Sequence, residues 1–392
     1  MPFAPSAALK QRHQNVRARL AERSLDALVV TTLPNVLYLT NFSGSSAIVV
    51  LTADRLYFVT DFRYVAAISE MRGQPDECPG LELVTVESSY DETLAQVLAG
   101  LKPRTTTAGA GLEPRTTDGA VRVGFEGANL TVARHEWLRR RLDGGPTFAT
   151  TEGLVESARV TKDAYELGVL REAGRRLSRV AAELAADVRK GRTELEVALD
   201  IDWRIRRAGF TKTAFDTIVA AGPNGALPHA HPTDRKLSEG DLVVLDFGGV
   251  WDSYCVDLTR TVSIGPAGDR ARAVYAAVLK AHDRAIQAIR PGVSRFAIDG
   301  AARESLGEDG MADAFGHGTG HGLGIEVHED PRIGRRRPDA DPDDAVTADM
   351  VFTVEPGAYF PGWGGVRIED DVLVTKTGAE LLTHVTTDLL EL

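Results

Sequence analysis

Four acidic residues in strand-like segments of the C-terminal half carry the strongest chemical signal of this chain. Asp246 and Asp257 occur in VVLDFGGVWDSYCVDLTRTV, and Glu355 and Glu369 in TVEPGAYFPGWGGVRIEDDVLV. A buried ionised carboxylate is costly unless it is paired or metal-bound, and the neighbours here are Val, Leu, Ile and Phe. Two divalent cations would neutralise the four carboxylates and would make bound water a nucleophile near neutral pH. The acids therefore predict a two-metal site.

Strand alternation can bring the acids of each pair to one face of a hairpin. Asp246 shares a strand face with Val244, and Asp257 shares one with Thr259. The turn-forming segment PGWGG, residues 361–365, joins the two segments of the second pair. A single acid beside turn glycines is more often a solvated edge residue. Four such acids around a histidine-rich segment argue against that reading.

Histidines lie between the two acid pairs, in GHGTGHGLGIEVHEDP, which contains His317, His321 and His328. Glycines alternate with the first two histidines, which favours close approach of the backbone to another group over an exposed loop. His229 and His231 precede the first acid strand, and only one of them need take part. Carboxylates with one imidazole suit Mn, Co, Fe or Zn.

Composition excludes several other classes of protein. The 392 residues contain 43% hydrophobic and 26% charged residues, as in soluble globular proteins of two domains. The net charge of -11 is spread along the chain, which disfavours nucleic acid as a partner. Cys78 and Cys255 show no CxxC spacing and indicate a reducing compartment. The N-terminus lacks a signal-peptide core and no apolar run reaches membrane length, so we expect a cytoplasmic protein without a membrane partner.

The elements that would position these residues follow from periodicity. In the first 155 residues, helical patterns alternate with short apolar runs, which favours an α/β layer with a largely parallel sheet. The expected helices are 8–23, 91–101 and 131–142, and the expected strands are 27–30, 47–51, 56–60, 82–86 and 121–126. We expect a loop from Lys102 to Ala120 and a domain boundary near residue 155.

The C-terminal part combines long helices with the acid-bearing strands. A helical pattern extends to Gly191, and Thr193 with Glu196 predicts a capping box for the next helix. Another helix is indicated by an inward apolar stripe that ends before Pro291. The similar spacings within the acid pairs, 257 − 246 = 11 and 369 − 355 = 14, suggest an ancient duplication with one hairpin on either side of a shared site.

At these residues the chain resembles the metal-dependent Xaa-Pro peptidases, that is, the prolidases and aminopeptidases P, in the superfamily of methionine aminopeptidase and creatinase. The resemblance covers nearly the whole chain, and its motifs, in order, are IVAAGPNGALPHA, GDLVVLDFG, DLTRT, GHGLGIEVHE, TVEPGAY and GGVRIED. It implies a creatinase-type α/β N-terminal domain with a mixed sheet, residues 1–155, which includes TDFRY at 60–64. It also implies an α+β pita-bread catalytic domain, residues 156–392.

The resemblance implies roles for individual residues. The implied metal ligands are Asp246, Asp257, His321, Glu355 and Glu369, with Asp257 and Glu369 bridging two ions such as Mn, Co or Zn. His317 also precedes a glycine, but the pattern GHGxGxxxHExP selects His321. The implied catalytic and substrate-binding residues are His229, His317, His328, Glu355 as proton shuttle, and Arg367; Tyr359 and Arg367 would orient the ligands.

The resemblance implies hydrolysis of the peptide bond before proline in a small peptide with proline at its second position. A dipeptidase is favoured over an aminopeptidase P, and family members are commonly homodimers, in which Arg63 or Tyr64 of the partner could close the substrate site. A pita-bread enzyme that is not a peptidase, or a binding module, is a remote alternative, because all five ligands are present. The charged segment 334–346 predicts an exposed rim or a solvated loop.

Overall fold

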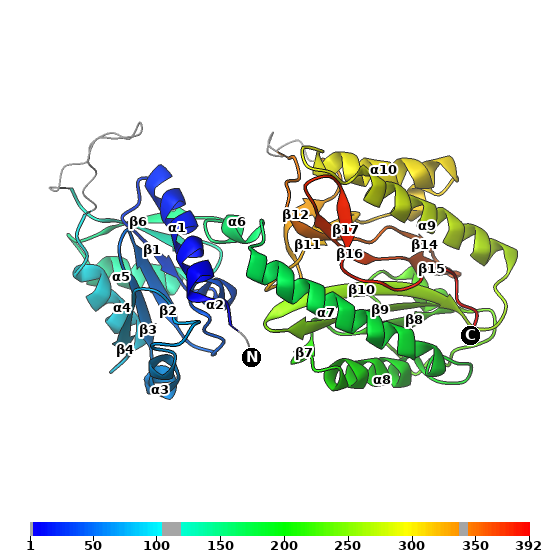
Figure 1. Ribbon diagram of the computed structural model, residues 1–392, viewed down its shortest axis with the longest axis horizontal. Coiled ribbons are helices and arrows are strands. Elements are labelled where there is room, and N and C mark those ends of the chain that lie inside the picture. Colours follow the sequence, from blue (N-terminus) through cyan, green and yellow to red (C-terminus); the bar gives the residue numbers. More distant parts are fainter. Residues whose placement is uncertain (1–2, 104–118, 337–343) are drawn as a thin grey trace. The chain divides into compact units, whose positions relative to one another are not determined.

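The computed structural model describes residues 3–103, 119–336 and 344–392 (Figure 1). The chain divides into two compact units, Met1–Arg159 and Val160–Leu392. Most of the expected loop 102–120 and the middle of the charged segment 334–346 lie outside the described residues. Among the residues described, no helix is long and apolar enough to cross a membrane.

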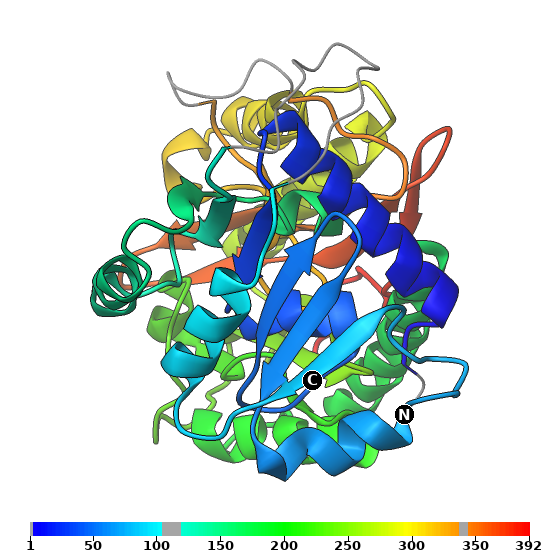
Figure 2. The same cartoon turned by 90° about the vertical axis from the view of Figure 1, so that its left-hand side faces the viewer.

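The N-terminal unit contains a six-stranded mixed sheet, whose strands are the blue to cyan arrows of Figure 2. Its order is β4-β3-β2-β1-β5-β6. Strand β2 pairs antiparallel with both of its neighbours, whereas the other pairings are parallel. The mixed sheet is thus confirmed, with a larger antiparallel share than the alternating pattern suggested. The strands are β1 (Ala27–Val30), β2 (Ile48–Thr52), β3 (Leu56–Thr60), β4 (Leu81–Thr85), β5 (Arg122–Glu126) and β6 (Thr147–Thr151).

Helices pack against this sheet because its central strands, β1 and β2, are almost entirely apolar and buried along their whole length. Leu94 of α4 and Leu138 of α5 belong to one apolar core with Val29, Val50 and Val123 of the strands. On α1, buried Arg12 and His13 hydrogen-bond to backbone carbonyl oxygens of α2. The helices of this unit are α1 (Ser6–Glu22), α2 (Leu33–Thr40), α3 (Phe62–Glu70), α4 (Tyr90–Ala99), α5 (Val132–Arg141) and α6 (Glu156–Arg159).

The described part of the C-terminal unit contains two larger sheets, a two-stranded sheet and two pairs of long helices. Strands β9 (Leu242–Trp251) and β10 (Tyr254–Ser263) form a long hairpin. Strands β7 (Lys212–Thr213) and β8 (Ile218–Ala221) both pair antiparallel with β9 and complete this sheet. The second sheet has the order β12-β11-β13-β16-β17, and β14 pairs with β15 separately. These strands are β11 (Gly320–Gly322), β12 (Glu329–Ile333), β13 (Val351–Val354), β14 (Gly357–Phe360), β15 (Gly364–Arg367), β16 (Asp370–Val374) and β17 (Ala379–Leu381).

Each of the two larger sheets of this unit shares an apolar core with one helix pair (Figure 1). Helices α7 (Ala164–Glu183) and α8 (Glu194–Arg207) share a core with β9 and β10. Helices α9 (Asp269–Ala288) and α10 (Arg295–Glu308) share one with β13 and β16. Short 3-10 turns occupy Leu184–Ala186, Gly222–Ala226 and Ala312–Ala314. The predicted capping box of α8, formed by Thr193 and Glu196, is present.

Candidate metal centre

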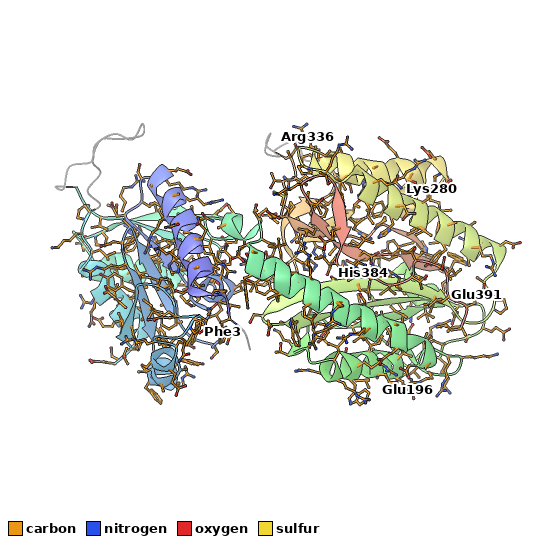
Figure 3. The ribbon with its side chains drawn as sticks, in the orientation of Figure 1. Phe3, Glu196, Lys280, Arg336, His384 and Glu391 are labelled. Carbon is orange, nitrogen blue, oxygen red and sulfur yellow. The ribbon has the colours of Figure 1, made fainter. Side chains whose placement is uncertain are left out.

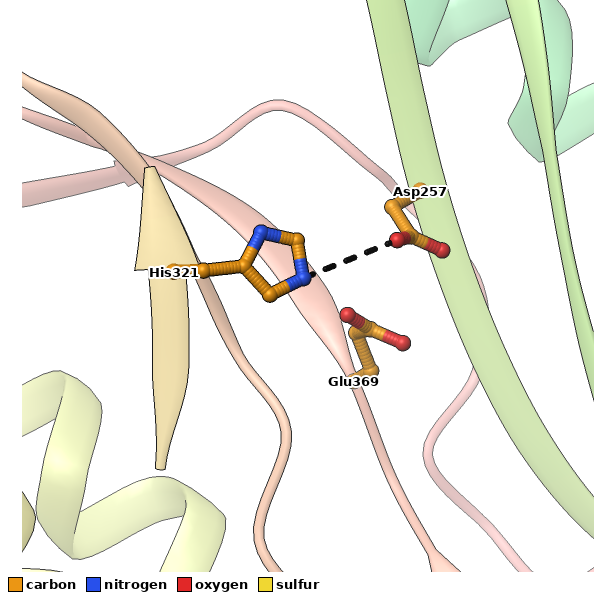
Figure 4. Close-up of side chains that lie close together, drawn as sticks. All are labelled: Asp257, His321 and Glu369. Carbon is orange, nitrogen blue, oxygen red and sulfur yellow. Dashed lines mark ion pairs between the residues drawn. The ribbon is translucent and has the colours of Figure 1, made fainter. Parts of the chain in front are cut away.

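The five predicted ligands come from both halves of the C-terminal unit. Asp246 lies on β9, Asp257 on β10 and His321 on β11, whereas Glu355 follows β13 and Glu369 precedes β16. Ligand atoms of Asp257, His321 and Glu369 lie within 4.8 Å of one another (Figure 4). The Nε2 atom of His321 lies 4.0 Å from Oδ2 of Asp257 and 3.7 Å from Oε1 of Glu355. The structure therefore brings these four side chains to one place.

The pairing of β9 with β10 explains how the two aspartates share a face. Asp246 is opposite Thr259, and Asp257 is opposite Gly248, so both carboxylates project from the same side of the hairpin. The Oδ2 atom of Asp246 accepts a hydrogen bond from Nη2 of Arg367 at 2.6 Å. This agrees with the alternation read from the sequence.

The two glutamates sit differently from expectation, because each falls in a break of its hairpin. The ladder pairs Val354 with Asp370 and resumes with Gly357 and Arg367, leaving Glu355 and Glu369 outside the strands. Their backbone amides are bonded elsewhere: Glu355 N donates to Thr319 O at 2.7 Å, and Glu369 N donates to Thr259 O at 3.1 Å. These bonds tie the second hairpin to the histidine segment and to β10, and so assemble the site.

Burial and mutual repulsion dominate the electrostatics of the acids. Burial, followed by the charges of neighbouring carboxylates, raises the pKa of Asp257 and of Glu369 well above the usual range. Burial also raises the pKa of Glu355 to about 7, although Arg367 opposes this rise. Burial lowers the pKa of His321 to about 3, with a smaller contribution from His328. The site therefore combines a neutral imidazole with carboxyls whose charges lack compensation.

A divalent cation fits this arrangement. The Oδ1 atoms of Asp246 and Asp257 are buried and have no hydrogen-bond partner among the described residues. A buried carboxylate oxygen without a donor is costly, and a cation would compensate it. The donor atoms are carboxylate oxygens and one imidazole nitrogen, a set suited to Mn, Co, Fe or Zn.

Two predicted supporting residues, Tyr359 and Arg367, belong to one hydrogen-bond chain. Arg367 donates from Nη1 to the hydroxyl of Tyr359 at 2.9 Å and from Nε to Thr259 Oγ1 at 3.2 Å. Thr259 in turn donates to Oε2 of Glu369 at 2.6 Å. Nε2 of His317 lies 2.8 Å from the Tyr359 hydroxyl. Arg367 thus contacts Asp246 directly and Glu369 through Thr259.

A second supporting network, behind Glu369, was missed by the sequence analysis. Arg260 donates to the backbone carbonyl of Glu369 at 2.6 Å and to Asp370 Oδ1 at 2.9 Å. His282 Nε2 lies 3.2 Å from Asp370, and Asp371 accepts from the backbone N–H of Asp257 at 3.0 Å. The run of three acids, EDD, in an apolar strand was the signal for this network.

The histidines line a cleft of about 1020 Å³ together with the five acid and imidazole ligands. The predicted residues His229, His317, His328 and Arg367 all lie on its wall, as does His231. The ring centroid of His328 is 4.3 Å from that of His321. Burial lowers the pKa of His317 to about 4 and also lowers the pKa of His328.

An ion pair on α10 holds the segment that carries His317. Asp299 pairs with Arg303 at 2.7 Å and accepts hydrogen bonds from the backbone N–H and hydroxyl of Thr319 at 3.1 and 2.8 Å. Arg303 also donates to the carbonyl oxygens of Phe315 and His317. These contacts were not foreseen, because nothing near Asp299 in the sequence marks it as part of a site.

The rim of the cleft is basic on one side. Arg332, Arg335 and Arg336 line the cleft and are exposed. Arg335 and Arg336 belong to the charged segment 334–346, whose residues 337–343 lie outside the described part. The prediction that this segment is an exposed rim remains untested for those residues.

The glycines of the histidine segment permit close backbone contacts, as expected. A Cβ atom on Gly320 would lie 1.8 Å from Thr353 O, and one on Gly322 would lie 2.2 Å from Asp330 O. Gly316, in contrast, has no heavy atom within 4 Å of such a position. The two inner glycines therefore let β11 pack between β12 and β13.

Replacement of Gly320 by alanine should destabilise the protein. We expect Gly320→Ala to lower the free energy of unfolding by about 3 kcal/mol or more, because backbone atoms of Thr353 must move. Urea denaturation followed by circular dichroism measures the change. Gly316→Ala is the matched control, expected to change stability by no more than about 0.5 kcal/mol. Equal stability of the two variants would contradict this packing.

Comparisons with known proteins agree with the fold and the site. Residues 168–376 match the model of metallopeptidase family M24, and residues 12–161 match the creatinase/prolidase N-terminal domain. The chain is 30% identical to the Xaa-Pro dipeptidase of Pyrococcus furiosus, over 97% of this chain and 100% of that one.

Two solved structures are similar over nearly their full length. An Xaa-Pro dipeptidase from Bacillus anthracis is 32% identical, with a TM-score of 0.87, covering 98% of this chain and 100% of that one. An X-Pro aminopeptidase from Thermotoga maritima is 30% identical, with a TM-score of 0.81, covering 95% and 99%.

The fold and the site define a metal-dependent hydrolytic enzyme of the pita-bread type. More specifically, the chain belongs to metallopeptidase family M24, and it joins an M24 catalytic domain to a creatinase/prolidase N-terminal domain.

Proposed function

We propose that this protein is an Xaa-Pro dipeptidase, a prolidase, whose activity resides in residues 156–392. The observation that carries the proposal is the group of buried carboxylates and one imidazole on the wall of a large cleft lined by further histidines. The full-length similarity to proteins named Xaa-Pro dipeptidase supports the substrate class. Proline lacks an N–H, so a site that acts on the scissile carbonyl suits this substrate better than one that grips extended backbone.

Two divalent ions per chain are part of the proposal, with manganese, cobalt or zinc as candidates. Asp257 and Glu369 would be shared by both ions, His321 and Glu355 would complete one set of ligands, and Asp246 the other. The ions would supply Lewis-acid chemistry and activate water near neutral pH. The unpartnered oxygens of Asp246 and Asp257 support this assignment.

The remaining roles follow from the protonation behaviour of the side chains. Glu355 lies 3.7 Å from His321 on the wall of the cleft, where its carboxylate would take up a proton and pass it to the proline nitrogen. Burial lowers the pKa of His328, so its ring stays neutral and would donate one N–H to a substrate carbonyl without adding charge. The neutral ring of His317 donates its N–H from Nδ1 to the Gly318 carbonyl and faces the Tyr359 hydroxyl with Nε2, so it would line the substrate cleft. Arg367 and His229 would bind the substrate, and Tyr359 would support Arg367.

A peptide panel tests the proposed substrate. Hydrolysis of Xaa-Pro dipeptides, with little turnover of Xaa-Pro-Xaa tripeptides, is expected of a dipeptidase. Faster cleavage of the tripeptides would establish the alternative, an aminopeptidase P, which leaves the carboxyl end of the substrate open. Cleavage of neither set by the metal-loaded protein would contradict both, and would favour a pita-bread enzyme that is not a peptidase or a binding module.

Metal binding should strengthen as the pH rises through about 7. Asp257, Glu355 and Glu369 have raised pKa values, so the ion-free site retains protons that a cation must displace at lower pH. His321, with a lowered pKa, needs no deprotonation. Titration calorimetry of Mn²⁺ in buffers of different ionisation enthalpy should show more protons released per ion at pH 6 than at pH 8. A constant affinity and no proton release would contradict this.

We further propose a cytoplasmic homodimer. Both cysteines, Cys78 and Cys255, are buried and unbridged, which suits a reducing compartment. Arg63 or Tyr64 from the partner could close the substrate end, although within the chain Arg63 pairs with Asp61 at 2.8 Å and Tyr64 bonds to Ser45. Light scattering coupled to size exclusion tests the dimer, which a mass of about 42.2 kDa would contradict.

A further inference from the structure

His229 lies on a segment whose conformation is not set by the histidine itself. Residues 222–233, here called the His229 loop, connect β8 with the approach to β9 and line the cleft through Pro228, His229 and Ala230. The His229 side chain is exposed, and its ring makes no hydrogen bond to any described residue. The backbone of the loop therefore determines where the imidazole lies.

A single buried carboxylate binds both ends of this loop. Glu194, the first residue of α8, is 0% exposed. Its Oε1 atom accepts from the backbone N–H of Ala221 at 2.7 Å and from Nδ2 of Asn224 at 3.0 Å. Its Oε2 atom accepts from the backbone N–H and the hydroxyl of Thr233 at 3.0 and 2.6 Å. Glu194 thus closes the loop between Ala221 and Thr233.

Further hydrogen bonds hold the His229 loop and the segment that follows it against α8 and Arg367. The backbone N–H of Glu194 donates to Arg235 O at 3.0 Å, and that of Leu195 donates to Thr233 O at 3.1 Å. In the middle of the loop, Arg367 donates to Pro228 O at 3.3 Å. Every described partner of the Glu194 carboxylate is a donor, so both oxygens are satisfied, and charged acceptors make the stronger hydrogen bonds.

We propose that Glu194 is a positioning residue for substrate binding. It holds the His229 loop in the conformation that presents His229 to the peptide, without touching the substrate itself. The inference rests on the proposed function, in which His229 binds the substrate. A change at Glu194 should alter substrate affinity and leave metal binding unchanged, because none of the five metal ligands contacts Glu194.

The test is the variant Glu194→Gln. A glutamine offers one acceptor oxygen and an NH2 group, so the NH2 group must face donors from Ala221 or Thr233. We expect KM for an Xaa-Pro dipeptide to rise about tenfold, with kcat changed less than about threefold and the bound manganese unchanged. Hydrogen exchange in residues 222–233, measured by mass spectrometry, should become faster.

Glu196→Gln is the matched control. Glu196 lies in the same turn of α8, is exposed (Figure 3) and accepts from the backbone N–H of Thr193, not from the His229 loop. This variant should leave KM and exchange in the loop unchanged. Thr233→Val removes the hydroxyl that donates to Glu194 and that accepts from the backbone N–H of Arg235 and from Nδ2 of Asn224. This variant should also raise KM and serves if Glu194→Gln does not fold.

Two results would overturn the proposal. One is a folded Glu194→Gln protein with normal exchange in residues 222–233. The other is faster exchange with an unchanged KM, which would make Glu194 structural only. Failure of the unaltered protein to cleave any Xaa-Pro peptide would instead contradict the proposed function, and the exchange contrast between the two glutamine variants would still decide whether Glu194 holds the loop.

Discussion

The Asp257→Ala variant is expected to lose metal binding and peptide hydrolysis together. Asp257 is 5% exposed, belongs to the group of ligand atoms within 4.8 Å, and has one oxygen without a partner. Its backbone is held separately, by the bond from its N–H to Asp371, so the strand should survive the substitution. We expect kcat/KM to fall by more than about 100-fold, because even residues that only support metal ligands reach that size of effect.

In the absence of ions, the Asp257→Ala substitution should not lower the thermal stability of the protein. Burial and the neighbouring carboxylates raise the pKa of Asp257, so its ionised form destabilises the ion-free fold at neutral pH. Ion-free Asp257→Ala should therefore melt no lower than the ion-free parent, whereas the manganese-loaded parent should melt higher than both. Activity, metal content by mass spectrometry and thermal melting measure the three quantities. Asp200→Ala, which removes a partly exposed carboxylate of α8, is the control and should leave activity and metal content unchanged. Full turnover by the Asp257→Ala variant would contradict the assignment of Asp257 as a metal ligand.

Chelation is expected to have the second large effect, abolishing hydrolysis and lowering the melting temperature. The ligands come from separate strands and meet only when the chain folds, so ions should bind the folded state alone. Ions at about one hundred times their Kd would add roughly 2.7 kcal/mol, or about 5 °C or more in a domain of this size. Differential scanning calorimetry before and after EDTA treatment measures the shift.

Replacement of the ions provides the control for chelation. Adding Mn²⁺, Co²⁺ or Zn²⁺ to the EDTA-treated protein after removal of the chelator should restore both activity and melting temperature. Titration to an end point gives the number of ions, for which we propose two per chain. If metal analysis shows that the EDTA-treated protein is ion-free and its catalysis is nevertheless undiminished, the metal centre is excluded.

Much of this site could be predicted, because the relevant signals are local. Ionisable side chains between Val, Leu and Phe in strands are costly, so Asp246 and Asp257 were conspicuous. Strand alternation then placed both on one face, as the pairing of β9 with β10 confirms. Glycines beside His321 predicted close packing, and the backbone of Thr353 occupies the space that a side chain would need.

Other features depended on partners far along the chain. Glu355 and Glu369 leave their strands because their amides bond to Thr319 and Thr259, which periodicity does not reveal. The contact of Arg260 with Asp370 and the closure of the His229 loop by Glu194 likewise join segments distant in sequence. The share of antiparallel pairing around β2 also differed from the pattern of alternating helices and strands.

The sequence by itself determined which groups could do chemistry here: acids and histidines in apolar or glycine-rich segments, whose cost of burial predicts a cation. The tertiary structure decided which of these groups meet and how their pKa values respond. The interaction of two charges depends on their separation and on the water around them, and both are set only when the strands and helices pack together. Asp257, Glu355 and Glu369 acquire their raised pKa values from that packing.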